Sequence, residues 1–556
     1  MAKFNEERQQ KKFQELREKE AEDLAKILAS KYGIPYLDLS RITIDLDSLK
    51  TITEAEAREG QLAVFQSVGK KLQIAVKNPE LQKTKEILEG LKNKKFEPQL
   101  FLVSENSLKK ALSRYPEIPA FVEASSGIID VSPARLEEFQ VKVKGIASLR
   151  ELLTAAVSVK ESRKISEVLE MILAGALALE ASDIHIEPGE AKTELRVRLD
   201  GVLSELVSFP PNVLQLLLSR IKLVSELKLN IKDRAQDGRF TIRTKETDVE
   251  VRTSVLPGHY GESVVLRVLH PKTIAMKFED LGMQAELLEI IAAELKKPNG
   301  MILTTGPTGS GKTTTLYAFV KKVDTPGIKI VTIEDPIEYH LAGITQTQVD
   351  VSKGYDFSSG LRSILRQDPD VILVGEIRDQ ETAQVAMHAA LTGHLVFSTL
   401  HTNDAAGTIP RLIDLGVKPN IIAPAINATM AQRLVRKICK VCAKEHKLTA
   451  GEKKTIEAEF ISWPSKIKKP DLENATLFSP VGCKACNETG FKGRVGVFEA
   501  FQVDDKIERL ILTDPSEVSI KEAFHLQGML TLKQDGILKA LGGITSLDEL
   551  ERVVGE

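Results

Sequence analysis

The chain has 556 residues, of which 42% are hydrophobic and 28% are charged, and its formal net charge is −2. This composition allows ordinary hydrophobic cores, and the near-neutral charge gives no general attraction for nucleic acid. Residues 1–23 are too densely charged for a signal peptide, and no apolar run approaches the roughly 18 residues that cross a membrane. We therefore expect a cytoplasmic protein of three or four domains, taking roughly 150 residues for each.

The N-terminal part predicts a small α/β domain followed by a linker. Residues 5–30 carry apolar side chains at helical spacing in a charged background, which predicts a solvated helix. Short strands and helices alternate from residue 32 to 114, and residues 1–115 contain no catalytic cluster. Residues 116–164 mix proline, serine, glycine and charge, a composition that is typical of a linker with some helix.

Residues 165–275 predict a second unit of helices and paired strands. A helix is expected over Ile165–Glu180, and the alternation in Glu194–Gly201 predicts a strand that ends in an Asp-Gly turn. Arg220 and Arg239 of this unit could supply cations to a phosphate group. Ordinary surface salt bridges are the alternative for both arginines.

A phosphate-binding loop follows at Gly306–Thr313. The apolar run Met301–Thr305 before it predicts a strand and residues 314–320 predict a helix, the context in which G-x-x-x-x-G-K-[ST] has meaning. Glycines let the backbone turn so that N–H groups point at phosphate oxygens, and the helix N-terminus adds partial positive charge. Lys312 can reach the β- and γ-phosphates of ATP, and the Thr313 hydroxyl suits Mg²⁺. A glycine-rich turn that binds nothing is the alternative.

The residues expected to bind the nucleotide form one continuous stretch. They are Gly306, Pro307, Thr308, Gly309, Ser310, Gly311, Lys312, Thr313 and Thr314.

Strands and helices alternate after this loop, which is typical of a parallel sheet. Residues 328–333 predict a buried strand that delivers Glu334 and Glu338 to the carboxyl edge of the sheet, where ligands bind in such folds. A second strand over residues 370–375 ends at Glu376.

ATP hydrolysis needs a carboxylate that orients water, a Mg²⁺ shell and cations on the transition state. Glu338 and Glu376 are the candidates for the two carboxylate roles, and solvated strand-end acids are the alternative. Two histidines, His394 and His401, flank the predicted strand Leu395–Leu400 and are candidates to contact the γ-phosphate or relay its loss.

Three further residues are candidates to bind the nucleotide. Glu334 follows the strand that leads to Glu338, and Arg362 and Arg366 lie on a helix expected over Phe357–Gln367. The arginines could act on the nucleotide of a neighbouring subunit, with surface salt bridges as the alternative.

The four cysteines form two C-x-x-C pairs, Cys439/Cys442 and Cys483/Cys486. In a cytosolic chain this pattern favours a metal over disulfides, and four thiolates from two tight turns match structural zinc. Four unliganded thiols are the alternative. Residues 443–482 exceed the roughly 15–20 residues of common zinc ribbons, so we expect a small structural lobe clipped at its base by Zn²⁺.

Several of these motifs resemble the secretion-ATPase superfamily. Gly306–Thr313, Thr332–Glu338, Leu361–Asp379 and Thr392–Asn403 are similar to its Walker A, Asp-box, Walker B and His-box elements. Within it, the chain resembles the type II secretion and type IV pilus assembly ATPases. Residues 181–188, 236–239 and 432–435 are also family-like, and the four cysteines fit the assembly branch rather than the pilus retraction ATPases.

The resemblance implies a multidomain α/β protein with a RecA-like P-loop motor domain built on a parallel sheet. Its implied parts are an N-terminal docking domain (1–115), a linker (116–164), a PAS-like α+β domain (165–275), the ATPase core (276–435), a tetracysteine zinc lobe (436–500) and a C-terminal helical part (501–556). It also implies a homohexamer with ATP between subunits, in which arginines near Arg220 and Arg239 act across the interface. Residues 227–235 depart from the basic stretch usual in the family, and a clear cyclic-dinucleotide motif is missing from the N-terminal region.

We therefore expect a hexameric ATPase that uses ATP, Mg²⁺ and Zn²⁺ and drives assembly of a pilus or a pseudopilus. Its expected partners are an inner-membrane platform protein and a cytoplasmic docking protein, with contact to the membrane only through them and none with nucleic acid. One alternative is a DNA-uptake or conjugation-type translocase, for which the balanced charge offers no basic groove. The other is an ATP-binding scaffold without turnover, against which Lys312, Glu338 and Glu376 argue. Pilus assembly and type II secretion both stay open, as does which of the two glutamates is the base.

Overall fold

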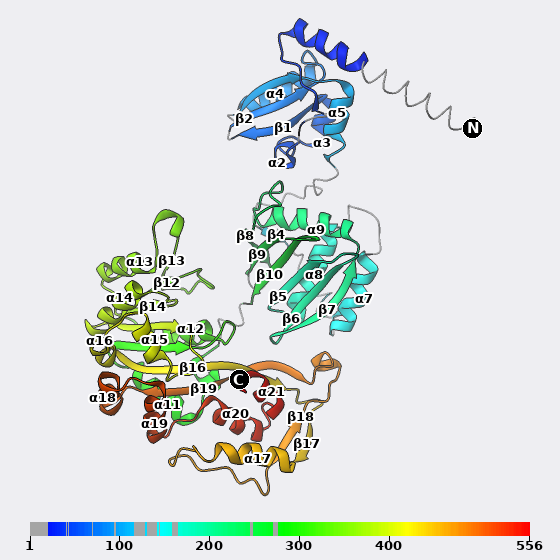
Figure 1. Ribbon diagram of the computed structural model, residues 1–556. Helices are drawn as coiled ribbons and strands as arrows, with labels where there is room; N and C mark the ends of the chain where they lie inside the picture. The colour runs from blue at the N-terminus through cyan, green and yellow to red at the C-terminus, as the bar shows by residue number, and fades with distance from the viewer. Residues whose placement is uncertain are drawn as a thin grey trace. The chain divides into compact units, whose positions relative to one another are not determined.

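The computed structural model describes residues 20–39, 42, 44–68, 70–93, 96–115, 128–130, 139, 142–143, 145–157, 165–244, 248–270 and 276–555 (Figure 1). The chain divides into two compact units. The first comprises residues 1–143, 148–198 and 203–268, and the second comprises residues 144–147, 199–202 and 269–556. Among the described helices none has the length and apolar character to cross a membrane.

The first unit begins with a helix over residues 20–32 and a small three-stranded sheet. The predicted helix over residues 5–30 is confirmed from residue 20, and its earlier part lies outside the described residues. The strand order is β1-β2-β3, with β2 antiparallel to β1 and parallel to β3. The elements are α2 (Leu46–Leu49), α3 (Glu54–Glu59), β1 (Leu62–Val68), β2 (Lys71–Val76), α4 (Gln82–Asn93), β3 (Glu97–Leu102) and α5 (Glu105–Leu112).

A seven-stranded sheet in the order β4-β8-β9-β10-β5-β6-β7 forms the rest of the first unit. Its strands are β4 (Ile128–Asp130), β5 (Asp183–Pro188), β6 (Thr193–Leu199), β7 (Val202–Phe209), β8 (Gln236–Arg243), β9 (Asp248–Gly258) and β10 (Gly261–Leu269), with helices α7 (Ile146–Val157), α8 (Ile165–Ala178) and α9 (Pro211–Val224). Buried and half-buried residues alternate along β6, so one face of the sheet is covered, and α9 packs against α8 and β5. The predicted Asp-Gly turn is confirmed, because Asp200 and Gly201 join β6 to β7 with φ of 47° and 86°.

The second unit is built on a seven-stranded sheet in the order β13-β12-β14-β15-β11-β16-β19. Its strands are β11 (Gly300–Thr305), β12 (Ile330–Glu334), β13 (Thr345–Gln348), β14 (Val371–Val374), β15 (Leu395–Leu400), β16 (Ile426–Ile438) and β19 (Phe491–Gln502). The strands are parallel up to β16, and β19 closes the sheet antiparallel to it. All residues of β11, β12, β14 and β15 are buried, as expected for strands covered on both faces.

Helices cover both faces of this parallel sheet, and the side chains of one strand alternate between them. Val371 and Leu373 of β14 pack with η4 (Phe278–Leu281), α11 (Ala285–Glu294) and α12 (Lys312–Val323), and this set forms one hydrophobic cluster. Ile372 and Val374 face the opposite cluster. That second cluster is made with α13 (Phe357–Ile364), α14 (Gln380–Leu391), α15 (Thr408–Asp414), α16 (Pro419–Ala425), α18 (Asp505–Thr513), α19 (Glu517–Gln527), α20 (Leu532–Leu541) and α21 (Leu547–Val554).

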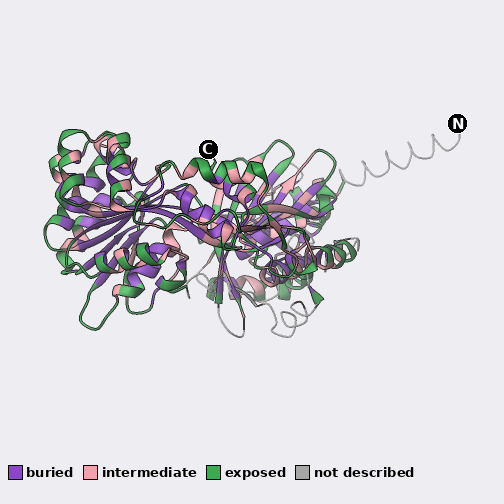
Figure 2. Cartoon of the chain, turned by 90° about the horizontal axis from the view of Figure 1, so that it is seen from below, coloured by how far each residue is buried: buried purple, intermediate pink, exposed green. Residues whose placement is uncertain are grey.

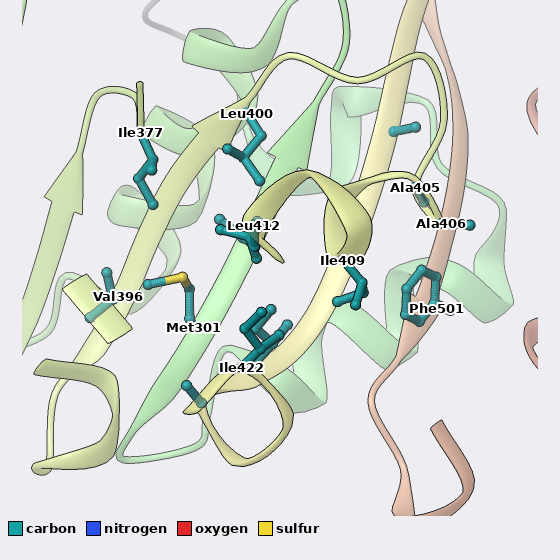
Figure 3. Packing of buried hydrophobic residues seen from close by; sticks show 14 of the residues in the cluster. Met301, Ile377, Val396, Leu400, Ala405, Ala406, Ile409, Leu412, Ile422 and Phe501 are labelled. Carbon is teal, nitrogen blue, oxygen red and sulfur yellow. The ribbon is translucent and has the colours of Figure 1, made fainter. Parts of the chain in front are cut away.

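The buried residues of the second unit lie between the sheet and its helices in these two clusters. Buried residues follow the strands, and exposed residues lie on the outer sides of the helices (Figure 2). In the second cluster, Met301 and Leu400 of the sheet pack against Leu412 of α15 and Ile422 of α16 (Figure 3).

The segment between β16 and β19 holds β17 (Lys444–Lys447), α17 (Ala450–Glu459), β18 (Thr476–Ser479) and the 3₁₀ turn η7 (Lys484–Cys486). Strands β17 and β18 pair antiparallel. Ile456 of α17 is fully buried in the same hydrophobic cluster as helix α20, so the segment packs against that helix. The amide of Gln534 on α20 also donates to the Glu459 and Ser462 carbonyl oxygens, both at 3.2 Å.

Candidate phosphate-binding site

The phosphate loop takes the predicted strand–loop–helix form, between β11 and α12. Its three glycines, Gly306, Gly309 and Gly311, have φ of 142°, 81° and 92°, values that side chains with a Cβ rarely adopt. A Cβ on Gly306 would lie 2.6 Å from the Gln432 carbonyl oxygen, and one on Gly311 would lie 2.8 Å from the Gln432 side-chain nitrogen. The loop therefore passes so closely over β16 that two of these positions exclude any side chain.

Lys312 closes the mouth of this loop. Its Nζ donates to the carbonyl oxygens of Gly306 at 2.7 Å and Pro307 at 3.2 Å. Burial lowers the pKa of the Lys312 ammonium below its usual range, while the Glu376 carboxylate opposes this shift and Arg433 adds to it. An anion at the loop would stabilise the charged form of Lys312.

Ser310 also fits an anion bound at the loop. Its side chain is only 4% exposed, and its hydroxyl has no hydrogen-bond partner among the described residues. A buried hydroxyl without a partner is costly unless a ligand satisfies it. Pro307, Thr308 and Gly309 are exposed at the tip of the loop, and Thr313 and Thr314 are half-buried in the first turn of α12. The residues present therefore fit a bound phosphate chain.

Glu376 lies two residues beyond the end of β14, near the phosphate loop. Its carboxylate contacts the Arg378 guanidinium at 2.5 Å and the His401 imidazole at 3.3 Å. The Glu376 side chain is 16% exposed, whereas His401 is 50% exposed. Arg378 and Asp335 also line a cavity of about 560 Å³ on the side of α13 and α14. The structure therefore brings Lys312, Glu376 and His401 together at the carboxyl edge of the sheet.

The segment after His401 is fastened to the phosphate-loop strand. The hydroxyls of Thr305 and Thr402 lie 2.7 Å apart, and the Thr402 N–H donates to the Thr305 hydroxyl at 2.8 Å. Arg433 of β16 donates to the Asn403 carbonyl oxygen at 2.7 Å. The contacts join β11, β15 and β16 at one edge of the sheet.

The sequence marks residues 432–435 as family-like, but it does not predict that Gln432 and Arg433 lie at this site. Nothing in the sequence sets β16 beside β11, and the order of the strands decides which residues lie under the phosphate loop. The available signal is that residues 432–435 resemble a segment of the family, because Gln432 and Arg433 are only two of several polar residues along β16.

The structure does not bring His394 to this site. Leu395 pairs with Gly300 and Leu400 pairs with Thr305, so His394 precedes β15 at the amino edge of the sheet. A strand of this length spans roughly 17–20 Å, so the phosphate loop of the same chain is out of reach. His394 instead contacts the Ala389 carbonyl oxygen with Nδ1 at 3.0 Å. Of the two histidines that are candidates to contact the γ-phosphate or relay its loss, only His401 lies at this edge of the sheet within one chain.

Glu334 is also placed differently from its expected role at the nucleotide. Its side chain is 3% exposed and lies under α12, because residues 332 and 334 share the face of the sheet that α12 covers. Thr332 donates to its carboxylate at 2.6 Å and Gln346 at 3.2 Å, and Tyr317 of α12 donates to the other oxygen. These three bonds occupy the carboxylate inside the fold.

Glu338 lies in the segment after β12 and is half-buried. Burial raises the pKa of the Tyr317 phenol, and the Glu334 and Glu338 carboxylates add to this shift. Tyr317 follows Thr313 by four residues, so the two side chains lie on one side of α12. The Glu338 charge therefore acts on the same side of this helix as the predicted Mg²⁺ ligand Thr313.

Arg362 and Arg366 lie away from the phosphate loop, on helix α13 and the turn that follows it. Helix α13 covers the face of the sheet opposite to α12. Arg362 pairs with Glu381 at 2.7 Å, and Arg366 donates to the Arg362 carbonyl oxygen at 3.0 Å and to Ser363 at 3.1 Å. Both arginines are exposed. Within one chain they do not contact this site.

Arg220 and Arg239 belong to the first unit. Arg220 lies on α9 and is 9% exposed, and burial lowers the pKa of its guanidinium against the attraction of Glu170. Arg239 is exposed on β8. Of the two, Arg239 is therefore the one available to a partner.

The four cysteines converge, as predicted from their spacing. Their sulfur atoms all lie within 4.8 Å of one another, with 3.9 Å between Cys439 and Cys483 and 3.7 Å between Cys442 and Cys486. The N–H groups of Cys483 and Gly490 point at the Cys486 sulfur from 3.1 and 3.2 Å, as is suitable for a thiolate. Four sulfurs from two tight turns fit a tetrahedral metal ion.

Two families match the chain. The family described as "Type II/IV secretion system protein" matches residues 158–552, and the MshEN domain matches residues 32–120.

Individual relatives and a solved structure also align with the chain. "Type IV pilus assembly ATPase TfpB" of Acinetobacter baylyi is 36% identical over 535 residues, covering 96% of this chain and 88% of the relative. "Type II secretion system protein E" of Aeromonas hydrophila is 43% identical over 392 residues, covering 70% of this chain and 76% of the relative. The X-ray structure of the Legionella pneumophila ATPase DotB has the same fold, with a TM-score of 0.51 and 22% identity over 71% of this chain and 97% of that one.

Proposed function

Because the chain belongs to the type II/IV secretion system protein family and carries an MshEN domain, we propose that it is an ATPase powering pilus or pseudopilus assembly. One observation carries the proposal. Lys312 of the phosphate loop follows β11 and Glu376 follows β14, so both lie at the carboxyl edge of the same parallel sheet. The similar proteins named as pilus assembly ATPases support it.

The residues of the loop bind the phosphates. Backbone N–H groups at Gly309 and Gly311, the Ser310 hydroxyl and the Lys312 ammonium bind phosphate oxygens, which satisfies the buried hydroxyl and stabilises the buried cation. Thr313 and Glu376 would hold Mg²⁺, which neutralises charge on the β- and γ-phosphates when it is bound.

The second carboxylate and the histidine complete the chemistry. Glu338 accepts a hydrogen bond from the attacking water and orients it toward the γ-phosphate. His401 contacts Glu376, so loss of the γ-phosphate changes the surroundings of His401. The change passes to Thr402 and Asn403, which are hydrogen-bonded to Thr305 and Arg433. These roles rest on position and charge, which supply most of the catalysis in phosphoryl transfer.

The assembly extends this site across subunits. The protein forms a homohexamer, and Arg239 and Arg220 of residues 165–275 act on the nucleotide of a neighbouring subunit. Residues 1–115 dock to the membrane machine through a platform protein and a cytoplasmic docking protein, so the hexamer works at the cytoplasmic side of the inner membrane. The four cysteines hold Zn²⁺, which closes the end of the β16–β19 pair and takes no part in hydrolysis.

Of the two machines, we favour the type IV pilus. The alignment with the pilus assembly ATPase runs over 96% of this chain, whereas the alignment with the type II secretion protein runs over 70%. Deleting the gene should remove surface pili and leave the set of secreted proteins unchanged. Loss of secretion with pili retained would assign the protein to the other machine.

The ATPase itself is tested with two variants that fail by different routes. Lys312→Ala should weaken binding of labelled ATP, because buried phosphate charge loses its partner. Glu376→Gln keeps the shape of the side chain and should bind ATP while releasing no phosphate. Wild-type turnover in both variants would overturn the proposed function, and tight ATP binding without turnover in the wild type would identify a scaffold.

A further inference from the structure

We propose that Gln346 is a positioning residue for Glu338, and that it acts by closing the segment that carries this carboxylate. The proposal rests on the proposed ATPase function, because Glu338 orients the attacking water only if the protein hydrolyses ATP. Gln346 itself does not contact the nucleotide. It names a side chain on edge strand β13 that no motif includes.

The side-chain amide of Gln346 bridges the two ends of the segment around Glu338. Its Nε2 donates to the Glu334 carboxylate at 3.2 Å, before Glu338, and to the Tyr339 carbonyl oxygen at 3.0 Å, directly after it. Its Oε1 accepts from the Leu341 N–H at 2.7 Å. One amide therefore fixes three points, and residues 335–338 are confined between them.

The register of the sheet places this amide on the correct face. Gln346 pairs with Thr332 between β13 and β12, so its side chain lies on the face covered by α12, beside the buried Glu334. Thr332 and Tyr317 also donate to Glu334, which holds the carboxylate to which Gln346 is bound. A hydrogen-bonded carboxylate of this kind is a rigid anchor, because moving it would leave several buried polar groups unsatisfied.

The same network reaches the helix that begins at the phosphate loop. Tyr317 lies on α12 four residues after Thr313, and its ring meets the ring of Tyr339 edge-on with 6.3 Å between centroids. Tyr339 is the residue next to Glu338. The start of α12, the anchor Glu334 and the segment carrying Glu338 are thus joined through Gln346 and two tyrosines.

Loss of these bonds should affect turnover more than binding. A displacement of about 1 Å of a reacting group can cost about 100-fold in rate, whereas the phosphate loop on β11 stays intact. Replacing Gln346 with methionine keeps the length of the side chain and removes all three hydrogen bonds.

The experiment measures steady-state ATP hydrolysis and binding of labelled ATP for Gln346→Met, with Gln348→Met as the matched control. Gln348 lies on the same strand but is exposed. We expect Gln346→Met to lower kcat by about 10- to 100-fold while KM and ATP affinity change less than about twofold. The control should hydrolyse ATP like the wild type. Gln346→Glu, which is isosteric but brings a second carboxylate to Glu334, should lose at least as much turnover.

A double variant separates positioning from general damage. If Gln346 acts through Glu338, then Glu338→Gln combined with Gln346→Met should hydrolyse no more slowly than Glu338→Gln alone. Full kcat in a folded Gln346→Met protein, or losses that multiply in the double variant, would overturn the positioning role. Either result leaves the ATPase proposal standing, whereas a wild-type protein that hydrolyses no ATP would remove that proposal first.

Discussion

The Thr315 hydroxyl donates a hydrogen bond of 2.8 Å to the side-chain oxygen of Gln432, and both side chains are buried. This contact ties α12 to strand β16 directly beneath the phosphate loop. Thr315→Val or Gln432→Leu leaves a buried partner unsatisfied, so each should lower the free energy of unfolding by about 1–3 kcal/mol. The double variant should cost less than the sum of the two, as measured by urea unfolding. Strict additivity would show that the bond contributes nothing.

The two histidines around β15 should differ sharply. His401 contacts Glu376, so His401→Ala should lower kcat by about 100-fold. His394 lies at the amino edge of the sheet, so His394→Ala should keep kcat within about twofold of the wild type at saturating ATP. Phosphate release assays on both proteins make the comparison, and equal losses would contradict the assignment.

Glu499 of β19 should make stability depend on pH. Burial raises the pKa of its carboxyl from 4.5 to about 7, against the Ala405 N–H that donates to it, and Asp404 raises it further. Below pH 4.5 the Glu499 carboxyl is protonated in both the folded and the unfolded chain, so its ionisation does not change the free energy of unfolding. As the pH rises from 4.5 to 7 only the unfolded chain ionises, so the wild type loses about 3 kcal/mol, and the loss is constant above pH 7.

Glu499→Gln removes that titration. The free energy of unfolding of the variant minus that of the wild type should rise between pH 5 and pH 7 and level off above it. Urea unfolding at four pH values measures the difference. A difference that does not change with pH would show that Glu499 ionises normally in the folded protein.

The cysteine cluster should hold one zinc ion per subunit, measured by elemental analysis. Cys483→Ser should lose it. Because Ile456 and Gln534 hold α17 against α20 without the metal, we expect new protease cuts near residues 437–443 and 480–490 rather than within α17. Metal-free wild-type protein that resists proteolysis at both places would show that the cysteines need no ion.

Arginines should act between subunits. Arg239→Ala should lower kcat by about 1,000-fold, the effect of losing a cation on the transferred phosphate. Mixing it with Lys312→Ala should partly restore turnover, since each protein supplies what the other lacks. Arg243→Ala, exposed on the same strand, is the matched control. No recovery in the mixture, with both proteins shown to co-assemble, would place Arg239 in another role.

Local features of the second unit were predictable, because strand, loop and helix are neighbours in the sequence. The phosphate loop between β11 and α12 and the position of Glu376 after β14 follow from short patterns. The convergence of the four cysteines also follows, because two C-x-x-C turns together supply the four ligands of one metal ion. That the ion is zinc stays a prediction.

The position of His394 depends on the direction of its strand, and the burial of Glu334 depends on the alternation of side chains along its strand. A residue that precedes a parallel strand lies at the edge away from the ligand, which puts His394 there. Glu334 ends its strand with its side chain on the α12 face, and period-two alternation decides that burial. Gln432 and Arg433 could not be placed, because strand order arises from the packing of the whole sheet.

The pairing of β16 with β19 runs from Ala428↔Gln502 to Ile438↔Phe491, so the two strands meet where the segment that carries the cysteines begins and ends. Residues 439–490 are therefore an insertion in the β16–β19 hairpin. Each doubling of the length of such a loop costs only about 0.6 kcal/mol in closure entropy. Over evolutionary time, the lobe is therefore the part of this unit most open to grafting, shortening or loss. A descendant could replace the lobe with a short turn and keep the register that places Gln432 under the phosphate loop. It would also need polar residues on the side of α20 that α17 now covers.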